Sequence, residues 1–403
     1  MRLLLDQGSK LTFTNVNPGS TPPASDNLVL AIRTDARHAL SALQRNIVSH
    51  WQRQKVQSAY RETAEAVTVP ANPESVAKQI LHQSYQTWGE RVLGAFGRNL
   101  DYDQYGITDP AKKKLDIHFY NASALAQDAV TRGLNFVQER FGKDRPALLV
   151  TLDDMIEPHH GQNWSEIAFS RLFTPDGKQQ LDFVARPGRP PLPQQLDNVR
   201  QIVGSMAQQS GGNVPIILVE DNVRHAKMLN WVVGNMDKAG IFEKGTPAAI
   251  ATCFSMANER ERAAIQYKGA QIPVVASVDY GSAKVDVFTP RDLLFDGLVV
   301  QLNQERNGRL PAVFLDETSL TSRFKIRPDK TTEFLRDIRH ANAVFCYTVE
   351  KLVGSDLPLK WFACAEPIAQ VTGANPDRPM HGLMQSRRTN ALNTIGEGGG
   401  ADN

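Results

Sequence analysis

The pattern of apolar residues changes at Pro146, and this change constrains the fold more than any other feature. Residues 26–145 carry apolar side chains mainly at helical spacing, whereas short apolar runs alternate with helical segments after Pro146. Short apolar runs bounded by turn residues predict buried strands, and strands that alternate with helices predict a parallel sheet. We therefore expect an α/β fold with a mostly parallel sheet of Rossmann-like type, preceded by a helical N-terminal region.

Nine short runs after Pro146 have strand character. They cover residues 147–154, 166–173, 181–188, 214–221, 248–254, 272–279, 297–302, 311–317 and 342–348. The second and third runs flank the turn sequence TPDGK, which predicts a β-hairpin added to the sheet. A helix is expected at residues 223–239, between the fourth and fifth runs.

Turn-forming and polar stretches divide the chain into four expected segments. Residues 1–25 end in a Pro- and Ser-rich stretch and are expected to form a flexible arm, followed by the helical region at 26–145. The α/β domain is expected at 146–365. Residues 366–403 are polar and end in GEGGGADN, which predicts a partly disordered tail.

Composition narrows the classes of function. The chain has 45 basic and 43 acidic residues, and a net charge of +2 does not indicate nucleic-acid binding, which needs basic residues concentrated on one face. No apolar run reaches the ~18 residues expected of a membrane span. The three cysteines are far apart and form no CxxC pair, which fits a reducing compartment. We expect a cytoplasmic protein without a membrane partner.

The strongest motif is VPIILVED at residues 214–221, where an apolar run ends in Glu220 and Asp221. Ligands of open α/β sheets bind at the carboxyl ends of the strands. The first amides of a following helix attract anions, and carboxylates accept hydrogen bonds from hydroxyl groups or bind divalent cations. This stretch therefore offers both kinds of group that a sugar phosphate requires.

Residues 214–254 resemble the signature of the phosphoribosyltransferase family. In that family an apolar strand ends in two acids that hold the ribose hydroxyls of phosphoribosyl pyrophosphate, and the next loop wraps the 5-phosphate. The resemblance implies that Glu220 and Asp221 are the catalytic acids. It also implies that phosphate is held by the loop residues Asn222, Arg224, His225 and Lys227. This loop departs from the family pattern, because bulky basic residues replace small hydroxyl residues and a Gly, so it would bind phosphate by charge.

Two neighbouring segments add candidate ligands. Arg186 and Arg189 flank Gly188 in VARPGRPPLP and could grip the oxygens of a pyrophosphate, although a Pro-rich connection with two solvated arginines fits as well. The run at 147–154 ends in Asp153 and Asp154. Together with Asp221, these acids are the expected metal ligands, and Mg²⁺ is the expected cofactor because it prefers oxygen ligands.

An acid-ending first strand followed by a hairpin also resembles the HAD phosphatase family. The stretch VEDNVRHA at 219–226 is similar to a later acid motif of that family. The Asp-x-Asp motif that carries the family's nucleophile is absent around Asp153, which opposes this interpretation.

We therefore expect a phosphoribosyltransferase-like protein that binds a sugar phosphate with magnesium and transfers a phosphoribosyl group. A non-catalytic assembly or regulatory protein that retains the α/β fold is the alternative, and a HAD-like phosphatase is a further one. The altered loop favours the non-catalytic protein, whereas the repeated acid pairs favour the enzyme. The N-terminal helices carry Trp51 and Trp88, which indicate either a bundle core or a surface for a protein partner or self-association.

Overall fold

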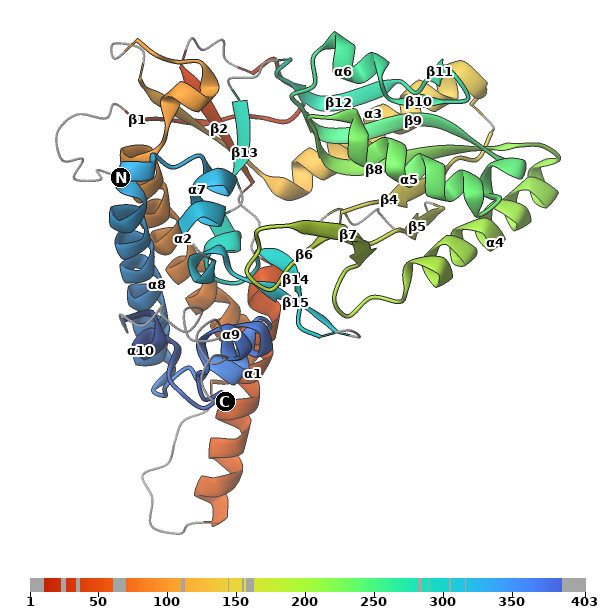
Figure 1. Ribbon diagram of the computed structural model, residues 1–403. Coiled ribbons are helices and arrows are strands. Elements are labelled where there is room, and N and C mark those ends of the chain that lie inside the picture. Colours follow the sequence, from red (N-terminus) through yellow and green to blue (C-terminus); the bar gives the residue numbers. More distant parts are fainter. Residues whose placement is uncertain are drawn as a thin grey trace, which may run out of the picture.

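The computed structural model describes residues 11–22, 27–33, 37–60, 70–109, 113–143, 145–153, 156, 163–281, 285–288, 290–303, 306–315 and 317–385 of the chain (Figure 1). It confirms an α/β fold in which mostly parallel sheets are combined with long helices. Among the described residues, no helix combines the length and the apolar character needed to cross a membrane.

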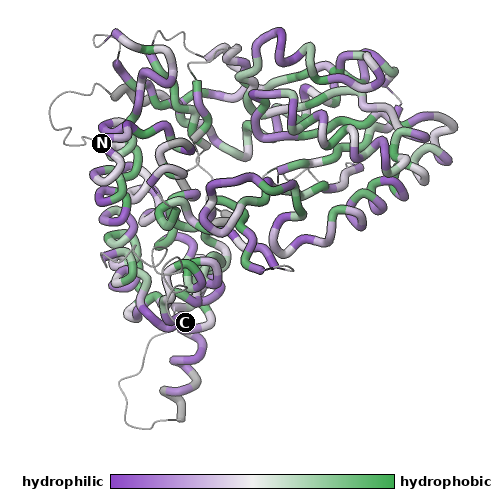
Figure 2. The backbone as a smooth tube through the Cα atoms, in the orientation of Figure 1, coloured by the Kyte–Doolittle hydropathy of each residue, from purple (hydrophilic) through white to green (hydrophobic). Residues whose placement is uncertain are grey.

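The central sheet has five parallel strands in the order β12-β9-β8-β4-β5. These strands are β4 (Leu148–Thr151), β5 (Trp164–Glu166), β8 (Val214–Val223), β9 (Gly245–Ser255) and β12 (Val274–Asp279). They are largely hydrophobic (Figure 2), as expected for strands covered on both faces. Because β8 is the middle strand, the expectation that the acid pair ends a central parallel strand is confirmed.

Helices cover both faces of this sheet. They are α3 (Ala122–Phe141), α4 (Leu192–Ser210) and α5 (Ala226–Lys238). Side chains alternate between faces along a strand, so Ile217 and Val219 of β8 pack with α3, whereas Ile216 and Leu218 pack with α4 and α5. A side chain at Gly133 of α3 would collide with β9, which explains a glycine inside a helix.

Two further four-stranded sheets flank the central one. The parallel N-terminal sheet has the order β1-β3-β2-β13, and the mixed sheet has the order β15-β14-β6-β7. The N-terminal sheet consists of β1 (Leu11–Asn15), β2 (Leu28–Arg33), β3 (Leu115–Tyr120) and β13 (Val285–Phe288). The mixed sheet consists of β6 (Phe169–Phe173), β7 (Gln180–Ala185), β14 (Leu298–Gln301) and β15 (Asn307–Leu310). The predicted hairpin is confirmed as β6–β7.

Helices from both ends of the chain form one helical region (Figure 1). They are α1 (Arg37–Tyr60), α2 (Pro73–Asn99), α7 (Glu317–Phe324), α8 (Thr331–Val353), α9 (Ala365–Thr372) and α10 (Met380–Gln385). Trp51 and Trp88 are both buried in its core, and Trp88 Nε1 donates a hydrogen bond to Asn342 Oδ1 at 2.7 Å. The bundle-core interpretation of these two tryptophans is therefore the one that the structure supports.

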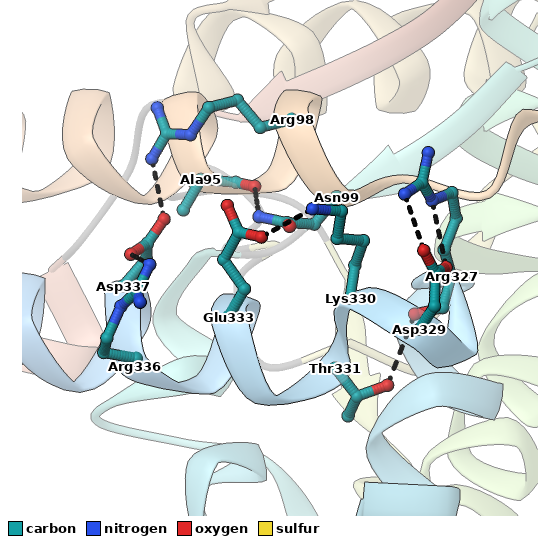
Figure 3. A network of polar contacts seen from close by, with 10 residues as sticks. All are labelled: Ala95, Arg98, Asn99, Arg327, Asp329, Lys330, Thr331, Glu333, Arg336 and Asp337. Carbon is teal, nitrogen blue, oxygen red and sulfur yellow. Dashed lines mark hydrogen bonds and ion pairs between the residues drawn. The ribbon is translucent and has the colours of Figure 1, made fainter.

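Charged side chains line the contact between α2 and α8 (Figure 3). Arg98 of α2 binds Asp337 of α8 with Nη2 to Oδ2 at 2.9 Å, and Lys330 binds Glu333 at the start of α8 with Nζ to Oε2 at 2.8 Å. The first pair joins the two helices, the second lies at the start of α8, and each of these four charges lies beside one of opposite sign.

The strand prediction is wrong for two of the nine runs. Residues 311–317 contain the 3₁₀ turn Ala312–Phe314, and residues 342–348 lie inside α8. A short apolar run cannot be told from a segment of a buried helix by periodicity alone. The apolar residues of α8 lie on the side of the helix that is buried against α2. The run at 342–348 is helical because it is part of this longer helix.

The expected segment boundaries also differ from the structure. Strand β1 lies within the stretch expected to be a flexible arm, and β2 and β3 lie within the region expected to be mainly helical. The boundary expected at 365 falls at the start of α9, and Met380 of α10 is fully buried rather than part of a tail. Strand β13 pairs with β2 across more than 250 residues of sequence, which no local pattern indicates. Residues 386–403 lie outside the described part of the chain.

The remaining short elements close the connections of the α/β part. They are α6 (Glu259–Ala263), β10 (Gln266–Tyr267) and β11 (Ala270–Gln271), and the two strands form a small antiparallel hairpin.

Candidate functional site

Three carboxylates converge at the carboxyl edge of the central sheet. Asp153 follows β4, and Glu220 and Asp221 lie near the C-terminal end of strand β8. Strands β4 and β8 are neighbours with Thr151 opposite Val219, so the acids that follow these positions meet. One oxygen atom from each of the three side chains lies within 4.8 Å of the others. We call Asp153, Glu220 and Asp221 the acid cluster.

The acid cluster is mostly shielded from solvent. Glu220 is 5% exposed and Asp153 is 6% exposed, whereas Asp221 is partly exposed. Burial raises the pKa of Glu220 well above its usual value, and the charge and hydrogen bond of Asp221 and the charge of Asp153 raise that pKa further. Like charges in a buried place are unfavourable unless a proton or a cation compensates them. The cluster is therefore suited to bind a cation.

The donor set fits a hard divalent cation. All three ligands are carboxylates, which suit Mg²⁺, Mn²⁺ and Ca²⁺ better than softer metals. Asp221 was expected as a ligand and lies in the cluster, as does Asp153. Asp154, the third expected ligand, lies outside the described residues. Glu220 completes the described set instead.

Arg186 brings a positive charge to the acid cluster from the end of the β6–β7 hairpin. Its Nε donates to the carbonyl oxygen of Phe169 at 2.9 Å, and its Nη2 donates to that of Leu152 at 3.1 Å. The same Nη2 lies 3.9 Å from Oδ2 of Asp153. These backbone contacts fix the guanidinium group, and its charge lowers the pKa of Glu220 in opposition to the effects of burial and the other acids.

Arg189 is held less firmly than Arg186. Its Nη2 lies 3.0 Å from Oε1 of Glu166 at the end of β5, and its side chain is 42% exposed, compared with 14% for Arg186. Both arginines therefore lie at the carboxyl edge of the sheet beside acids. Of the two, Arg189 has the more exposed side chain.

The turn at residues 222–227 is held by side chains from other elements. Nη2 of Arg224 donates to Oδ1 of Asp286 at 2.9 Å and to the carbonyl oxygen of Val285 at 2.5 Å. The amide of Ala226, at the start of α5, donates to Oε2 of Glu261 at 3.2 Å. A carboxylate thus takes the place at the helix N-terminus where an anion is expected to bind.

The other expected phosphate ligands of this turn have different surroundings. Nδ2 of Asn222 donates to Oδ1 of Asp221 at 2.6 Å, so Asn222 orients a member of the acid cluster. His225 is exposed, with Nδ1 3.7 Å from Oε1 of Glu261, and Lys227 is exposed on the first turn of α5. Arg224 and the Ala226 amide therefore already have partners within the chain, whereas His225 and Lys227 are exposed cations of the turn.

Glu261 and Asp286 are the important residues that sequence reasoning did not place at this turn. Both lie far from the turn in sequence, in α6 and β13. The available signal was the basic character of the turn itself, because two or three cations near a sheet edge attract carboxylates from other elements. The sequence alone does not say which carboxylates these are.

Comparisons of the chain with protein-family models, with curated proteins and with solved structures found no match. The protein is therefore described by its fold and its acid cluster. It is an α/β protein with a group of buried carboxylates and an arginine at the carboxyl edge of a parallel sheet.

Proposed function

We propose that the protein is a magnesium-dependent enzyme that acts on a sugar phosphate, with the acid cluster as its metal site. The observation that carries this proposal is the convergence of Asp153, Glu220 and Asp221 from two neighbouring strands. When bound there, Mg²⁺ would neutralise the carboxylates and attract phosphate oxygens. The edge of a parallel sheet is also the usual place for a ligand in such folds.

Phosphoribosyl transfer is the reaction that we propose for this site. Asp221 is the most exposed acid of the cluster, so its carboxylate would accept hydrogen bonds from the ribose hydroxyls. Arg189 would leave Glu166 to bind the pyrophosphate group, while Arg186 stays in place as a fixed positive charge. The 5-phosphate would have to displace Glu261 from the start of α5 if it binds there.

The non-catalytic alternative is favoured by this occupied turn. Arg224 is paired with Asp286, and Glu261 accepts from the first amide of α5, so the residues that should receive phosphate already hold the protein together. In that case the protein would be an assembly or regulatory protein that retains the α/β fold. Self-association through α1 and α2 would have to use their outer faces, because Trp51 and Trp88 are inside.

We also propose a cytoplasmic location. All three cysteines, Cys253, Cys346 and Cys364, are free and buried, which fits a reducing compartment.

Thermal unfolding with phosphoribosyl pyrophosphate and Mg²⁺, added separately and together, tests the proposal. A ligand that binds only the folded state at 100 times its Kd adds about 2.7 kcal/mol of stability. We expect the largest rise in Tm with both ligands, and a smaller rise in Asp153→Asn and Asp221→Asn. The matched control is Asp197→Asn on α4, whose carboxylate is exposed and pairs with Arg200, and which should behave like the wild type.

The released product separates the possible reactions. Release of pyrophosphate in the presence of an acceptor base indicates phosphoribosyl transfer, whereas release of inorganic phosphate from sugar phosphates indicates the HAD-like phosphatase. Identical Tm values with and without Mg²⁺ and ligand, in the wild type and in both cluster variants, would instead favour the non-catalytic protein.

A further inference from the structure

Asp286 of β13 joins three segments that are far apart in the sequence. Its Oδ1 accepts a hydrogen bond from Arg224 Nη2 at 2.9 Å, and its Oδ2 accepts one from the hydroxyl of Tyr105 at 2.9 Å. The Nζ atom of Lys325 lies 3.4 Å from the same Oδ2. One partly buried carboxylate thus connects the turn after β8 with the segments that follow α2 and α7.

Lys325 directly follows the last residue of α7, a position where a left-handed residue often ends a helix. Lys325 has a φ of +50°, in the left-handed region where glycine is favoured over residues with a side chain. Its ammonium group lies 3.8 Å from the centre of the Tyr105 ring, and its carbonyl oxygen accepts from the amide of Asp101 at 2.7 Å. The amide of Ile326 donates to the carbonyl oxygen of Thr321 at 3.2 Å, so the left-handed Lys325 closes the end of α7. From there its side chain contacts Tyr105 and Asp286.

The junction lies close to the acid cluster along the chain. Arg224 directly follows Val223, the last residue of β8, and lies three residues after Asp221. Its guanidinium group is fixed on β13 by both the Val285 carbonyl oxygen and Asp286. Between these points, Asn222 donates to Asp221. A short stretch of chain therefore links the Asp221 carboxylate to the point where β13 holds Arg224.

We propose that Asp286 is a positioning residue for the acid cluster. Through Arg224 it holds the Asp221 carboxylate in its place beside the other two acids. This inference rests on the proposed metal site, and it adds Arg224 and Asp286 as residues that support that site. In this role Asp286 touches neither metal nor substrate. It couples the N-terminal sheet and the helical region to the metal-binding edge, because Tyr105 and Lys325 belong to segments next to the helices.

Calorimetric titration with Mn²⁺, together with thermal unfolding of the same samples, tests the proposal. The variants are Asp286→Asn, which keeps the shape of the side chain, and Arg224→Gln, which removes the ion pair from the other side. The control is Asp337→Asn, because Asp337 is also partly exposed and lies near two arginines, at 2.9 Å from Arg98 and 3.4 Å from Arg336, on the distant helix α8. All three variants should lower Tm.

Only the two junction variants should also weaken Mn²⁺ binding, by about tenfold each, which corresponds to about 1.4 kcal/mol. Because Arg224 and Asp286 act as a pair, the double variant should bind Mn²⁺ no more weakly than either single variant. Wild-type Mn²⁺ affinity in both junction variants would overturn the positioning role and leave the metal site intact. A wild-type protein that binds no Mn²⁺ would instead overturn the proposed function, and the positioning role with it.

Discussion

The acid cluster and the contact between α2 and α8 both gather charged side chains, with opposite results. Along α2 and α8 each charge in Figure 3 lies next to one of opposite sign, as in Arg98 with Asp337. At the edge of the central sheet three carboxylates gather, and Arg186 lies 3.9 Å from one of them. Partly exposed opposite charges add a little stability, whereas buried like charges reduce it. An arrangement that reduces stability is reasonable where a ligand compensates for it, and this contrast is the main argument for a binding site.

The largest effect is expected in the helical region. Trp88 is 1% exposed, packs with its ring centre 5.8 Å from that of Phe295 and 6.2 Å from that of Phe345, and binds Asn342. Replacing it with Ala should lower the free energy of unfolding by about 3–5 kcal/mol, the usual range for a large buried aromatic side chain. Urea denaturation measures this loss. The Mn²⁺ affinity of the folded fraction should stay at the wild-type value. A loss of Mn²⁺ affinity in this variant would contradict the inference that the core of the helical region and the acid cluster are independent.

The opposite sign is expected in the acid cluster. Glu220→Gln removes the buried ionisable group, which becomes a like charge when it loses its proton, but keeps the size of the side chain. It should raise the free energy of unfolding of the metal-free protein by roughly 1–3 kcal/mol, the scale of a poorly paired buried polar group. The same variant should bind Mn²⁺ more weakly, because it loses a carboxylate ligand. A Glu220→Gln protein less stable than the wild type would contradict the idea that this charge is unfavourable.

The stability of the metal-free protein should also depend on pH through Glu220. Its pKa is raised in the folded state, chiefly by burial, above the usual value of 4.5. The folded state therefore holds this proton more tightly than the unfolded state does, and the resulting stability is fully present below pH 4.5 and lost as pH rises through the folded pKa. The difference in unfolding free energy between wild type and Glu220→Gln, measured by urea denaturation from pH 4 to 8, isolates this dependence. A difference that does not change with pH would show that Glu220 has an ordinary pKa.

The smallest effect is expected for the ion pair between Arg98 and Asp337. The Arg98 side chain is 48% exposed, so solvent and salt weaken the attraction. A double-mutant cycle with Ala at both positions should give a coupling energy of about 0.2–1 kcal/mol, and less at 1 M salt. A coupling above that range would mean that the α2–α8 charges are as strongly coupled as buried pairs, and the two regions would differ less than we infer.

The sequence predicted the positions of the acids in the cluster better than their surroundings. The apolar run that ends in Glu220 and Asp221, and the one that ends in Asp153, each placed acids at the end of a strand, which is a local property. That β4 and β8 are neighbours is a property of the sheet, and it is what brings the three carboxylates together. The strand-end rule made their meeting a reasonable expectation, but strand order cannot be read from local patterns.

Long-range partners explain which local structure the sequence does not predict. Arg224, the expected phosphate ligand, is bound by Asp286 from another sheet. Strand β2 was assigned to a helical region because its partners, β3 and β13, follow it at very different distances in the chain. The run at 342–348 has the length and apolar character of a strand, but it is buried as part of a helix that begins at Thr331. In each case a partner distant in sequence decides the local structure.

The central claim, that the acid cluster binds a divalent cation, is tested most directly by anomalous X-ray scattering from crystals soaked in Mn²⁺. We predict one strong anomalous peak between the carboxylates of Asp153, Glu220 and Asp221, within bonding distance of at least two of them. The peak should be absent from Asp221→Asn crystals soaked under the same conditions. A wild-type map without a peak at these carboxylates, in crystals that bind Mn²⁺ elsewhere or nowhere, would contradict the account.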